Sequence, residues 1–303
     1  MTIREQAVPE LRVRPLPRIV ERLLKRLRLY WIFLAYVSAT LGYRRGDMFK
    51  LGLYHSVLSL AEFVHSPRPR ALTVRLAPDG HKVVISGRDE IAVLHAIFLR
   101  GEYQPGDDPE VIFDVGANVG FATLFFSRCH PTAHIVAVEA DPRTYPRLLH
   151  NVRELPNVTT VHRAVAGHDG SATFYPSSSS IGSSLTRIDG NVPAVVVPAS
   201  RLDTLMNELG IGRIDLLKID IEGAEFDVLA TAPMDRIGEI VAEVHYGLGH
   251  GDEQTLRQFL PGFDLRFREL SSPDLALLHA SRLAQTAEPQ PSPQATSCWR
   301  SQP

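Results

Sequence analysis

The sequence predicts an α/β protein in which helices cover both faces of a doubly wound, mostly parallel sheet. Three observations predict this fold class. From Val111 onward, short apolar runs typical of buried strands alternate with helical patterns. The first of these strands runs directly into a turn of small residues and an apolar-periodic helix. The chain of 303 residues is 44% hydrophobic, so it can bury a full-size core and is not disordered as a whole.

Residues 1–70 are predicted to form a basic helical extension, with 13 Lys and Arg against 5 Asp and Glu. Segment 17–31 has the pattern of a basic amphipathic helix. Segment 29–43 is apolar but would span only about 22 Å as a helix, less than the roughly 30 Å of a bilayer core. Three interpretations stay open: packing on the main body or on a second copy, peripheral contact with an anionic membrane, and a true span.

The segment 71–86 contains two β-rich runs around a Pro-Asp-Gly turn, which predicts a β-hairpin. A helix is expected over 89–103, with Asp89 as a candidate cap. Residues 71–283 are therefore predicted to form the main domain. Residues 284–303 are rich in Pro, Ser and Gln, and we expect a disordered tail there.

Within the main domain, the apolar runs predict five strands, and the intervening patterns predict three helices, after Gly120, after Asp141 and from Gly223. The strands are expected at 111–115, 134–140, 158–165, 214–220 and 239–245. Between the third and fourth strands, strand-like runs at 171–175 and 194–200 flank a loop rich in Ser and Gly at 177–184. That loop is interpreted either as a mobile lid over a ligand site or as a solvated connection.

The turn after the first strand is a candidate cofactor loop. Gly116 and Gly120 lack Cβ atoms that would obstruct a ligand, and Asn118 is the non-glycine residue that best tolerates left-handed backbone geometry. Glu139 closes the next strand about 20 residues later, where an acidic side chain can bind ribose hydroxyls. Asp114, on the strand tip, would attract an ammonium and a sulfonium, which favours S-adenosylmethionine over NAD. The alternative is a tight turn without a ligand.

Composition and charge limit the classes of ligand and the cellular compartment that we expect for this protein. Outside the first 70 residues the chain has 19 basic against 29 acidic residues, which argues against a nucleic-acid ligand. The two cysteines, Cys129 and Cys298, are too few for a disulfide framework or a cysteine-based zinc site, and no secretory signal is evident. We therefore expect a cytoplasmic protein, with membrane-peripheral contact through the N-terminal segment as an alternative.

Four stretches together resemble the FkbM-type methyltransferases: DVGANVGFATL, VEADP, LLKIDIEGAEFDVL and IVAEVHY, within roughly 83–246. The resemblance implies a Rossmann-like class I methyltransferase fold and an S-adenosylmethionine-dependent O-methyltransferase. Its acceptor would be a hydroxyl of a sugar, polysaccharide, polyketide or similar metabolite. This chain reads EADP where members commonly read EP, and the resemblance does not explain the basic N-terminal extension.

Side chains at two neighbouring strand tips are candidates for catalysis. Asp220 and Glu222 end one strand, and Glu243 and His245 end the next. His245 is expected to take the proton of the acceptor hydroxyl, with Glu243 or Asp220 orienting it, unless it merely caps its strand. Lys218 is expected to form a salt bridge with Asp220 or another carboxylate of this cluster.

Other interpretations of these residues remain. Glu225 could simply favour the N-terminus of the following helix. The carboxylates and His245 are also hard ligands for Mg²⁺ or Mn²⁺, but nothing in the spacing demands an ion, so no metal ligand is assigned.

Two other function classes are kept open. An NAD-dependent oxidoreductase is disfavoured by Asp114 and by the lack of a Tyr-x-x-x-Lys signature. A non-catalytic, membrane-associated binding protein that retains the fold is disfavoured by the intact cofactor loop.

Overall fold

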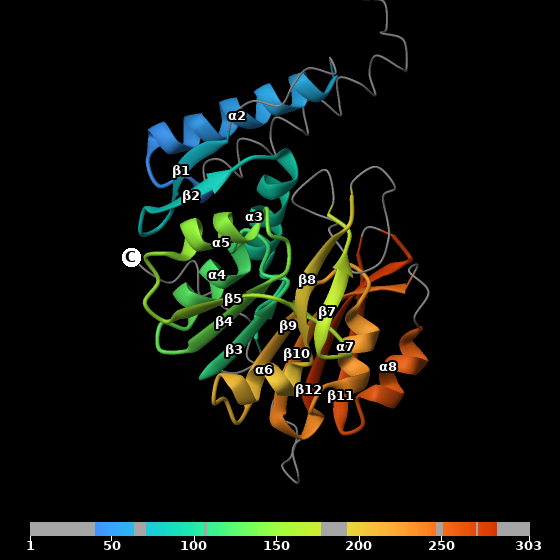
Figure 1. Cartoon of the computed structure of the whole chain (residues 1–303). Helices are drawn as coiled ribbons and strands as arrows, with labels where there is room; N and C mark the ends of the chain where they lie inside the picture. The colour runs from blue at the N-terminus through green and yellow to red at the C-terminus, as the bar shows by residue number, and fades with distance from the viewer. Residues whose placement is uncertain are drawn as a thin grey trace, which may run out of the picture.

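The computed structural model describes residues 40–63, 71–105, 108–176, 193–246, 251–270 and 272–283. Its centre is a seven-stranded sheet with the order β11-β12-β10-β9-β3-β4-β5, drawn in Figure 1. The strands are β3 (Val111–Val115), β4 (His134–Glu139), β5 (Val158–His162), β9 (Ile214–Ile219), β10 (Ile237–His245), β11 (Phe263–Glu269) and β12 (Leu275–Arg282).

The strand order reverses between β3 and β9. The chain runs outward from β3 through β4 to β5, and later starts again on the other side of β3 with β9 and β10, all five strands being parallel. Strand β12 is antiparallel to both of its neighbours, β10 and β11. This topology confirms the predicted doubly wound, mostly parallel, Rossmann-like fold, in which ligands bind at the switch point beyond the carboxyl ends of the strands.

Two hydrophobic cores cover the two faces of the sheet. Successive residues of a strand point to opposite faces, so Ile112 joins one core and Phe113 the other, both with no exposed surface. The first core includes α3 (Arg88–Arg100) and α4 (Phe121–Cys129), and α5 (Tyr145–Val152) packs nearby. The second core includes α6 (Leu202–Glu208), α7 (Glu225–Thr231) and α8 (Glu253–Phe259), and a short 3-10 helix η1 (Met234–Arg236) precedes β10.

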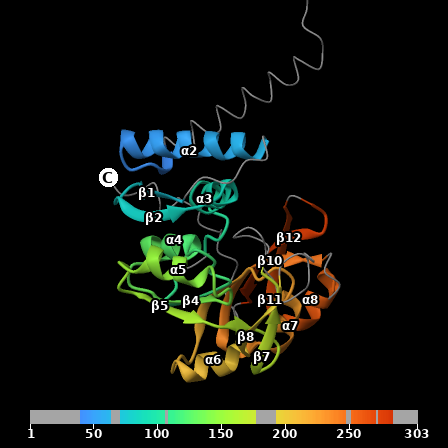
Figure 2. The ribbon, with the colours of Figure 1, turned by 45° about the horizontal axis from the view of Figure 1, so that its top comes forward.

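The N-terminal part of the described chain packs over the first core. Helix α2 (Arg45–Phe63) lies beyond the antiparallel hairpin of β1 (Leu72–Leu76) and β2 (His81–Ile85), as Figure 2 shows. This hairpin confirms the prediction for 71–86. Asn151 of α5 fastens it, because its side chain accepts the Val84 N–H at 2.9 Å and donates to the Val119 carbonyl at 2.8 Å.

Helix α3 begins differently from the prediction. It starts at Arg88 with Gly87 as its N-cap, and Asp89 lies inside the first turn and does not cap it. Gly87 has no side chain with which to cap the first turn, and the Glu90 carboxylate instead accepts both the N–H and the hydroxyl of Ser86, the residue before the N-cap, at 2.9 Å. The backbone ends the helix at Gly101 in a left-handed conformation, which glycine adopts without strain.

A second correction concerns the predicted strand 158–165. It is divided into β5 and the two-residue β6 (Ala164–Val165), which belongs to a separate sheet of order β6-β8-β7. Between them, the side chain of Arg163 turns toward Ser200 and Glu208, at 2.7 and 2.6 Å. The other members are β7 (Gly170–Phe174) and β8 (Val195–Ser200), which pair antiparallel and confirm the two predicted runs.

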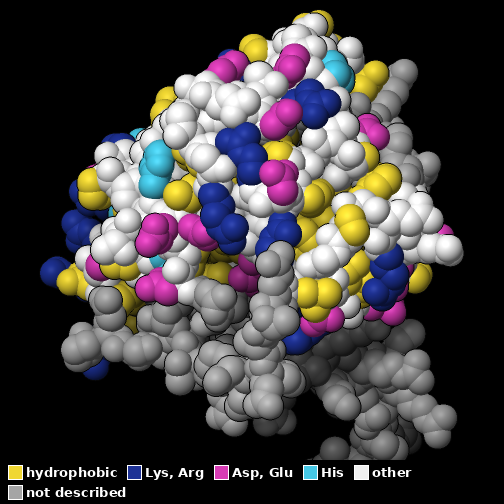
Figure 3. Space-filling view, turned by 90° about the horizontal axis from the view of Figure 1, so that it is seen from below, with side chains coloured by type: hydrophobic (Ala, Val, Ile, Leu, Met, Phe, Trp, Pro, Cys, Tyr) yellow, Lys and Arg dark blue, Asp and Glu magenta, His cyan; other side chains and the backbone are white. Residues whose placement is uncertain are grey.

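Several predictions fall outside the described residues: the amphipathic segment 17–31, most of the apolar segment 29–43, the loop 177–184 and the tail 284–303. Among the helices that the structure does describe, none is long and apolar enough to cross a membrane. On the face seen from below in Figure 3, basic and acidic side chains of the described residues are interspersed.

Candidate functional site

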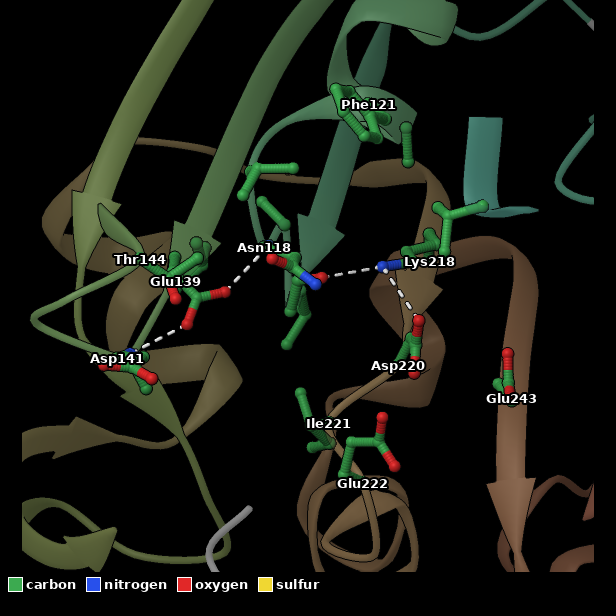
Figure 4. A pocket seen from close by; sticks show the side chains of 18 of the residues that line it. Asn118, Phe121, Glu139, Asp141, Thr144, Lys218, Asp220, Ile221, Glu222 and Glu243 are labelled. Atoms are coloured by element: carbon green, nitrogen blue, oxygen red, sulfur yellow. Dashed lines mark hydrogen bonds and ion pairs between the residues drawn. The ribbon is translucent and has the colours of Figure 1, made fainter. Parts of the chain in front are cut away.

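A cavity of about 190 Å³ opens at the switch point of the sheet, beyond the carboxyl ends of β3, β4, β9 and β10. Residues of α3 and of the segment that follows it form another part of its wall. Figure 4 shows Glu139 on one side of this pocket and Lys218, Asp220 and Glu243 on the other, with Asn118 between them. The structure therefore brings the candidate cofactor residues Asn118 and Glu139 to the same cavity as the candidate catalytic residues Lys218 and Asp220.

The turn after β3 has the left-handed geometry that the sequence predicts. Gly116, Asn118 and Gly120 have φ angles of 78°, 51° and 88°. Close packing within the protein also requires glycine at two of these positions. A Cβ on Gly116 would lie 1.8 Å from the Asp220 carbonyl oxygen, and one on Gly120 would lie 2.8 Å from Leu148 Cδ1. The glycines thus allow close approach of neighbouring protein segments, and the close approach of a ligand to Gly116, which lines the cavity, stays a prediction.

Glu139 is held rigidly at the end of β4. Its two carboxylate oxygens accept the backbone N–H groups of Asn118 and Asp141, each at 2.7 Å. Burial raises the pKa of Glu139 to about 7, although the two backbone donors oppose the rise. The carboxylate lines the cavity with lone pairs left over, so it is suited to accept hydrogen bonds from hydroxyl groups of a ligand.

Asp114 and Lys218 form a buried ion pair. Lys218 Nζ lies 3.1 Å from Asp114 Oδ1 and donates to the Gly116 carbonyl at 2.8 Å. Thr123 donates its hydroxyl to the other oxygen of Asp114 at 2.6 Å. Burial opposes the charged form of Lys218, but the neighbouring Asp114 and Asp220 carboxylates raise its pKa. Lys218 also lies 3.7 Å from Asp220, which confirms the predicted salt bridge.

The position of Asp114 does not fit direct contact with a cofactor. Its side chain has no exposed surface and is absent from the cavity wall, while Lys218 does reach that wall. Because both Asp114 oxygens already face Lys218 and Thr123, the carboxylate orients the lysine that touches the cavity. We therefore treat Asp114 as a positioning residue.

Asp220 lines the cavity directly after β9. Its carboxylate accepts the Tyr103 hydroxyl at 3.2 Å, and its side chain is 26% exposed. Tyr103 lies after α3, and burial together with the Asp220 charge raises its pKa well above the usual value. The ring of Tyr103 also lies 5.3 Å from Lys218 Nζ. Tyr103 was not predicted from the sequence, and the only local signal is its place just after the glycine that ends α3.

Strand β9 ends at Ile219, so Asp220 and Glu222 do not share a strand face as predicted. Glu222 has a φ of 56°, and its carboxylate points to His245, with Oε2 lying 3.1 Å from Nε2. The other ring nitrogen of His245, Nδ1, lies 3.2 Å from Oε1 of Glu225. His245 is therefore enclosed by Glu222 and Glu225, whereas the prediction had Glu243 or Asp220 orienting it.

This enclosure does not fit a general base. Burial alone would lower the pKa of His245, but hydrogen bonds to Glu222 and Glu225 raise it to about 11. At neutral pH the imidazole is already protonated and has no lone pair to offer. His245 is also absent from the cavity wall, although Glu222 lines it.

Glu243 offers a better base. It lines the cavity, and no hydrogen bond or ion pair joins it to another described residue. Burial, with the nearby Asp220 and Glu222 charges, raises the pKa of Glu243 to about 8, although His245 acts in the opposite direction. A carboxyl group with a pKa near the working pH can exchange a proton with a ligand hydroxyl.

Among the described residues, no three His, Cys, Asp or Glu side chains are placed to hold a metal ion together. Glu222 faces His245, and Asp220 faces Tyr103 and Lys218.

Comparison with known proteins finds a family model that matches the segment containing this site. Residues 114–269 match the family model described as "Methyltransferase FkbM domain". This segment contains the turn 116–120, Glu139 and the strand-tip residues Lys218, Asp220, Glu222, Glu243 and His245.

Three relatives illustrate the similarity. The chain is 32% identical over 166 residues to Methyltransferase 1 of Beauveria bassiana, covering 46% of this chain and 66% of that protein. It is 29% identical to the 2-O-methyltransferase NoeI of Sinorhizobium fredii, covering 41% of this chain and 57% of NoeI. It is 32% identical to the 31-O-demethyl-FK506 methyltransferase FkbM of Streptomyces tacrolimicus, covering 52% of this chain and 71% of that protein. The chain thus spans between about half and three quarters of the length of these relatives.

Proposed function

The chain belongs to the FkbM methyltransferase family, and we propose that it transfers a methyl group from S-adenosylmethionine to a hydroxyl group of a small molecule or glycan. One structural observation carries the proposal. Glu139, suited to bind ribose, and Glu243, suited to take a proton, line one cavity at the switch point of the sheet. The family match does not favour an NAD-dependent oxidoreductase or a non-catalytic binding protein.

The donor groups of the cavity fit the proposed cofactor. When bound, S-adenosylmethionine supplies a methyl group activated by its sulfonium charge. Glu139 would accept the ribose hydroxyls, because its oxygens face the cavity and two backbone donors hold them in place. The left-handed Asn118 brings its own N–H to Glu139 and so joins the cofactor turn to the ribose site.

Proton removal from the acceptor is assigned to Glu243. A hydroxyl oxygen is a weak nucleophile unless its proton leaves as the new O–CH₃ bond forms. Glu243 would accept that proton, and the products would be the methyl ether and S-adenosylhomocysteine. Asp220, held by Tyr103 and Lys218, would accept a hydrogen bond from a second hydroxyl and orient the acceptor.

A hydroxyl acceptor is supported by the named relatives. NoeI is a 2-O-methyltransferase and FkbM methylates 31-O-demethyl-FK506. We propose the corresponding class for this chain, a hydroxyl on a sugar, polysaccharide or polyketide-like metabolite. The predicted lack of a nucleic-acid partner stays a prediction.

Incubation with methyl-labelled S-adenosylmethionine and an extract of the source cell tests the function. We expect label in one fraction among lipid, polysaccharide and small molecules, in a form stable to mild base, as a methyl ether is. Glu139→Ala is the matched control and should abolish labelling at low cofactor concentration. Tight binding of NAD together with no labelled product would contradict the proposal.

We also propose that the basic N-terminal region contacts an anionic membrane surface from the cytoplasm. The described part of this region supports it. Phe49, Leu53 and Val57 form a stripe on α2 at a spacing of four residues, and they are 70%, 53% and 42% exposed. Lys50 lies beside this stripe and is exposed, while Asp47 is buried on the opposite face. An apolar stripe with basic neighbours is typical of a helix that lies on a membrane.

Co-sedimentation with vesicles tests the membrane contact. The full-length protein should bind vesicles that contain phosphatidylserine at low salt and bind them less tightly at high salt. Salt screens the electrostatic attraction to the anionic lipid but not the apolar contact. A variant with Phe49→Ser and Leu53→Ser should bind more weakly than the natural protein. Equal binding to neutral and anionic vesicles, or no binding at low salt, would refute the contact.

A further inference from the structure

Two hydrogen-bond acceptors enclose His245. Nε2 lies 3.1 Å from a Glu222 oxygen and Nδ1 lies 3.2 Å from a Glu225 oxygen. A neutral imidazole carries one N–H, so it can donate to only one of two carboxylates. Because both nitrogens face carboxylates at hydrogen-bond distance, a doubly protonated ring satisfies both contacts while Glu222 and Glu225 stay ionised.

The two carboxylates differ in their surroundings. Glu225 has no exposed surface and accepts the backbone N–H of Gly223 through both oxygens, at 2.9 and 3.0 Å. It also accepts the N–H of Ile221 at 3.3 Å. Glu225 is therefore an anchor at the start of α7, and His245 joins Glu222 to it.

The segment held in this way has an unfavourable backbone. Glu222 and Gly223 both have positive φ angles, 56° and 109°. Glycine tolerates this conformation, but a side chain with a Cβ is strained in it. The contact of Glu222 with His245 helps to maintain the strained conformation. The same turn supplies Asp220, Ile221 and Glu222 to the cavity wall.

We propose that His245 is a positioning residue, whose positive charge fixes the turn 220–223 against the cavity and balances the acidic groups around Glu243. The inference rests on the proposed function for its kinetic part only. Glu243 stands two residues before His245 on β10, so their side chains lie on the same side of the strand.

The charged groups near Glu243 come from several segments. Glu102 follows α3, Asp220 and Glu222 follow β9, and Lys218 lies within β9. Opposite Glu243 on β12 is Leu277, which carries no charge. Loss of the His245 cation would leave Glu222 unbalanced and make proton loss from Glu243 harder.

The first test needs no acceptor. In full-length protein labelled with ¹⁵N-histidine, both ring nitrogens of His245 should show protonated shifts from pH 6 to pH 9, identified by their absence in His245→Gln. His279 on the neighbouring strand β12 is the matched control, because burial and nearby arginines lower its pKa. Titration of His245 near pH 6.5 would overturn the inference.

The second test separates positioning from catalysis. His245→Gln should leave the affinity for S-adenosylmethionine within about twofold, lower kcat at neutral pH, and move the rising part of the pH–rate profile upward by about one pH unit or more. His245→Lys restores a positive charge and should return the profile toward that of the natural protein. His279→Gln should leave the profile unchanged.

Two results would contradict the proposal. One is an unchanged pH–rate profile in His245→Gln. The other is complete loss of turnover in both His245 variants when their cofactor affinity is normal, because a residue whose charge matters would be rescued by lysine. A natural protein that labels no acceptor fraction would overturn the proposed function, while the nitrogen shifts would still decide the charge of His245.

Discussion

The Nζ atom of Lys218 lies 3.1 Å from Oδ1 of Asp114, and both side chains are almost completely buried. The pair joins β9 to β3, the two strands at the switch point, at register partners of the sheet. Removing one partner of such a pair leaves a buried charge without compensation, which is strongly unfavourable.

Lys218→Met should therefore lower the free energy of unfolding by about 3 to 5 kcal/mol. The expected effect comes from the unpaired Asp114 carboxylate, so the double variant Lys218→Met, Asp114→Asn should recover part of the loss. Urea unfolding measures both. Arg257→Ala is the control, because the exposed pair of Arg257 with Glu253, 3.9 Å apart, should contribute less than about 1 kcal/mol.

Gly116→Ala should destabilise the protein by about 3 kcal/mol or more. The new Cβ would lie 1.8 Å from the Asp220 carbonyl oxygen, which belongs to backbone and cannot simply turn away. Gly210→Ala separates the collision from the conformational effect, since Gly210 has a φ of 69° but nothing within 4 Å of the added atom. It should lose only about 1 to 2 kcal/mol in the same thermal or urea unfolding experiment. Equal losses in the two variants would contradict the role of close packing.

Glu139→Ala should weaken binding of S-adenosylmethionine by about tenfold to several hundredfold, because each hydrogen bond to a charged group contributes about 1.5 to 3 kcal/mol. Titration calorimetry measures the affinity. A folded variant with unchanged affinity would refute ribose binding by this residue.

Cofactor binding should also depend on pH through Glu139. The charged carboxylate is the better acceptor, and its pKa without ligand is about 7, so affinity should rise as pH increases through about 7 and level off above it. Glu139→Gln should remove this dependence. In the protein without cofactor, the raised pKa of Glu139 makes the folded state less stable as pH rises, whereas cofactor affinity increases with pH. Its contribution to stability is full below the usual value of 4.5 and is lost as pH rises through about 7.

Glu243→Gln should lower turnover by about two to four orders of magnitude while cofactor affinity stays near that of the natural protein. In the natural protein the rate should rise with pH, with its midpoint near pH 8, where Glu243 loses its proton. Binding of the positively charged cofactor would shift this midpoint downward. A Glu243→Gln variant with normal turnover would move the role of base to another residue of the cavity.

Treatment with EDTA should leave methyl transfer intact. Glu222 faces His245, and Asp220 faces Tyr103 and Lys218, so these two carboxylates already have partners of their own. Rates measured before and after chelation, and after addition of Mg²⁺, test the expectation. Loss of activity that Mg²⁺ restores would show that a metal takes part.

The elements predicted best are those whose signal is local. The run 111–115 is apolar apart from Asp114, is followed by glycine, and forms β3 with the predicted bounds. The hairpin of β1 and β2 follows from alternation and a Pro-Asp-Gly turn. Strands β11 and β12 were both missed. Strand β11 nevertheless carried a local signal, since Phe263, Leu265 and Phe267 alternate with polar residues, and their partly or fully buried side chains face the second core.

The sequence predicted which residues lie in the candidate site better than it predicted which of their side chains contact each other. Strand tips converge at one edge of a parallel sheet, so the sequence could place Asp220, Glu222, Glu243 and His245 near one another. Which carboxylates meet His245 depends on a turn in which a non-glycine residue, Glu222, takes a positive φ. That conformation is maintained by contacts between segments far apart in the chain, and local pattern gives no sign of it.

The cavity wall extends beyond the segment that defines the family. The family match begins at Asp114, yet six wall residues precede it: Glu90, Val93, Ala96, Ile97, Glu102 and Tyr103. Arg147 of α5 joins this earlier segment to the family region through two 2.8 Å bonds to Glu90. A chimera that exchanges acceptor preference between relatives would therefore have to carry residues 71–105 together with the sheet. An exchange at Asp114 would combine cavity-wall residues 90–103 of one protein with the remaining wall residues of another.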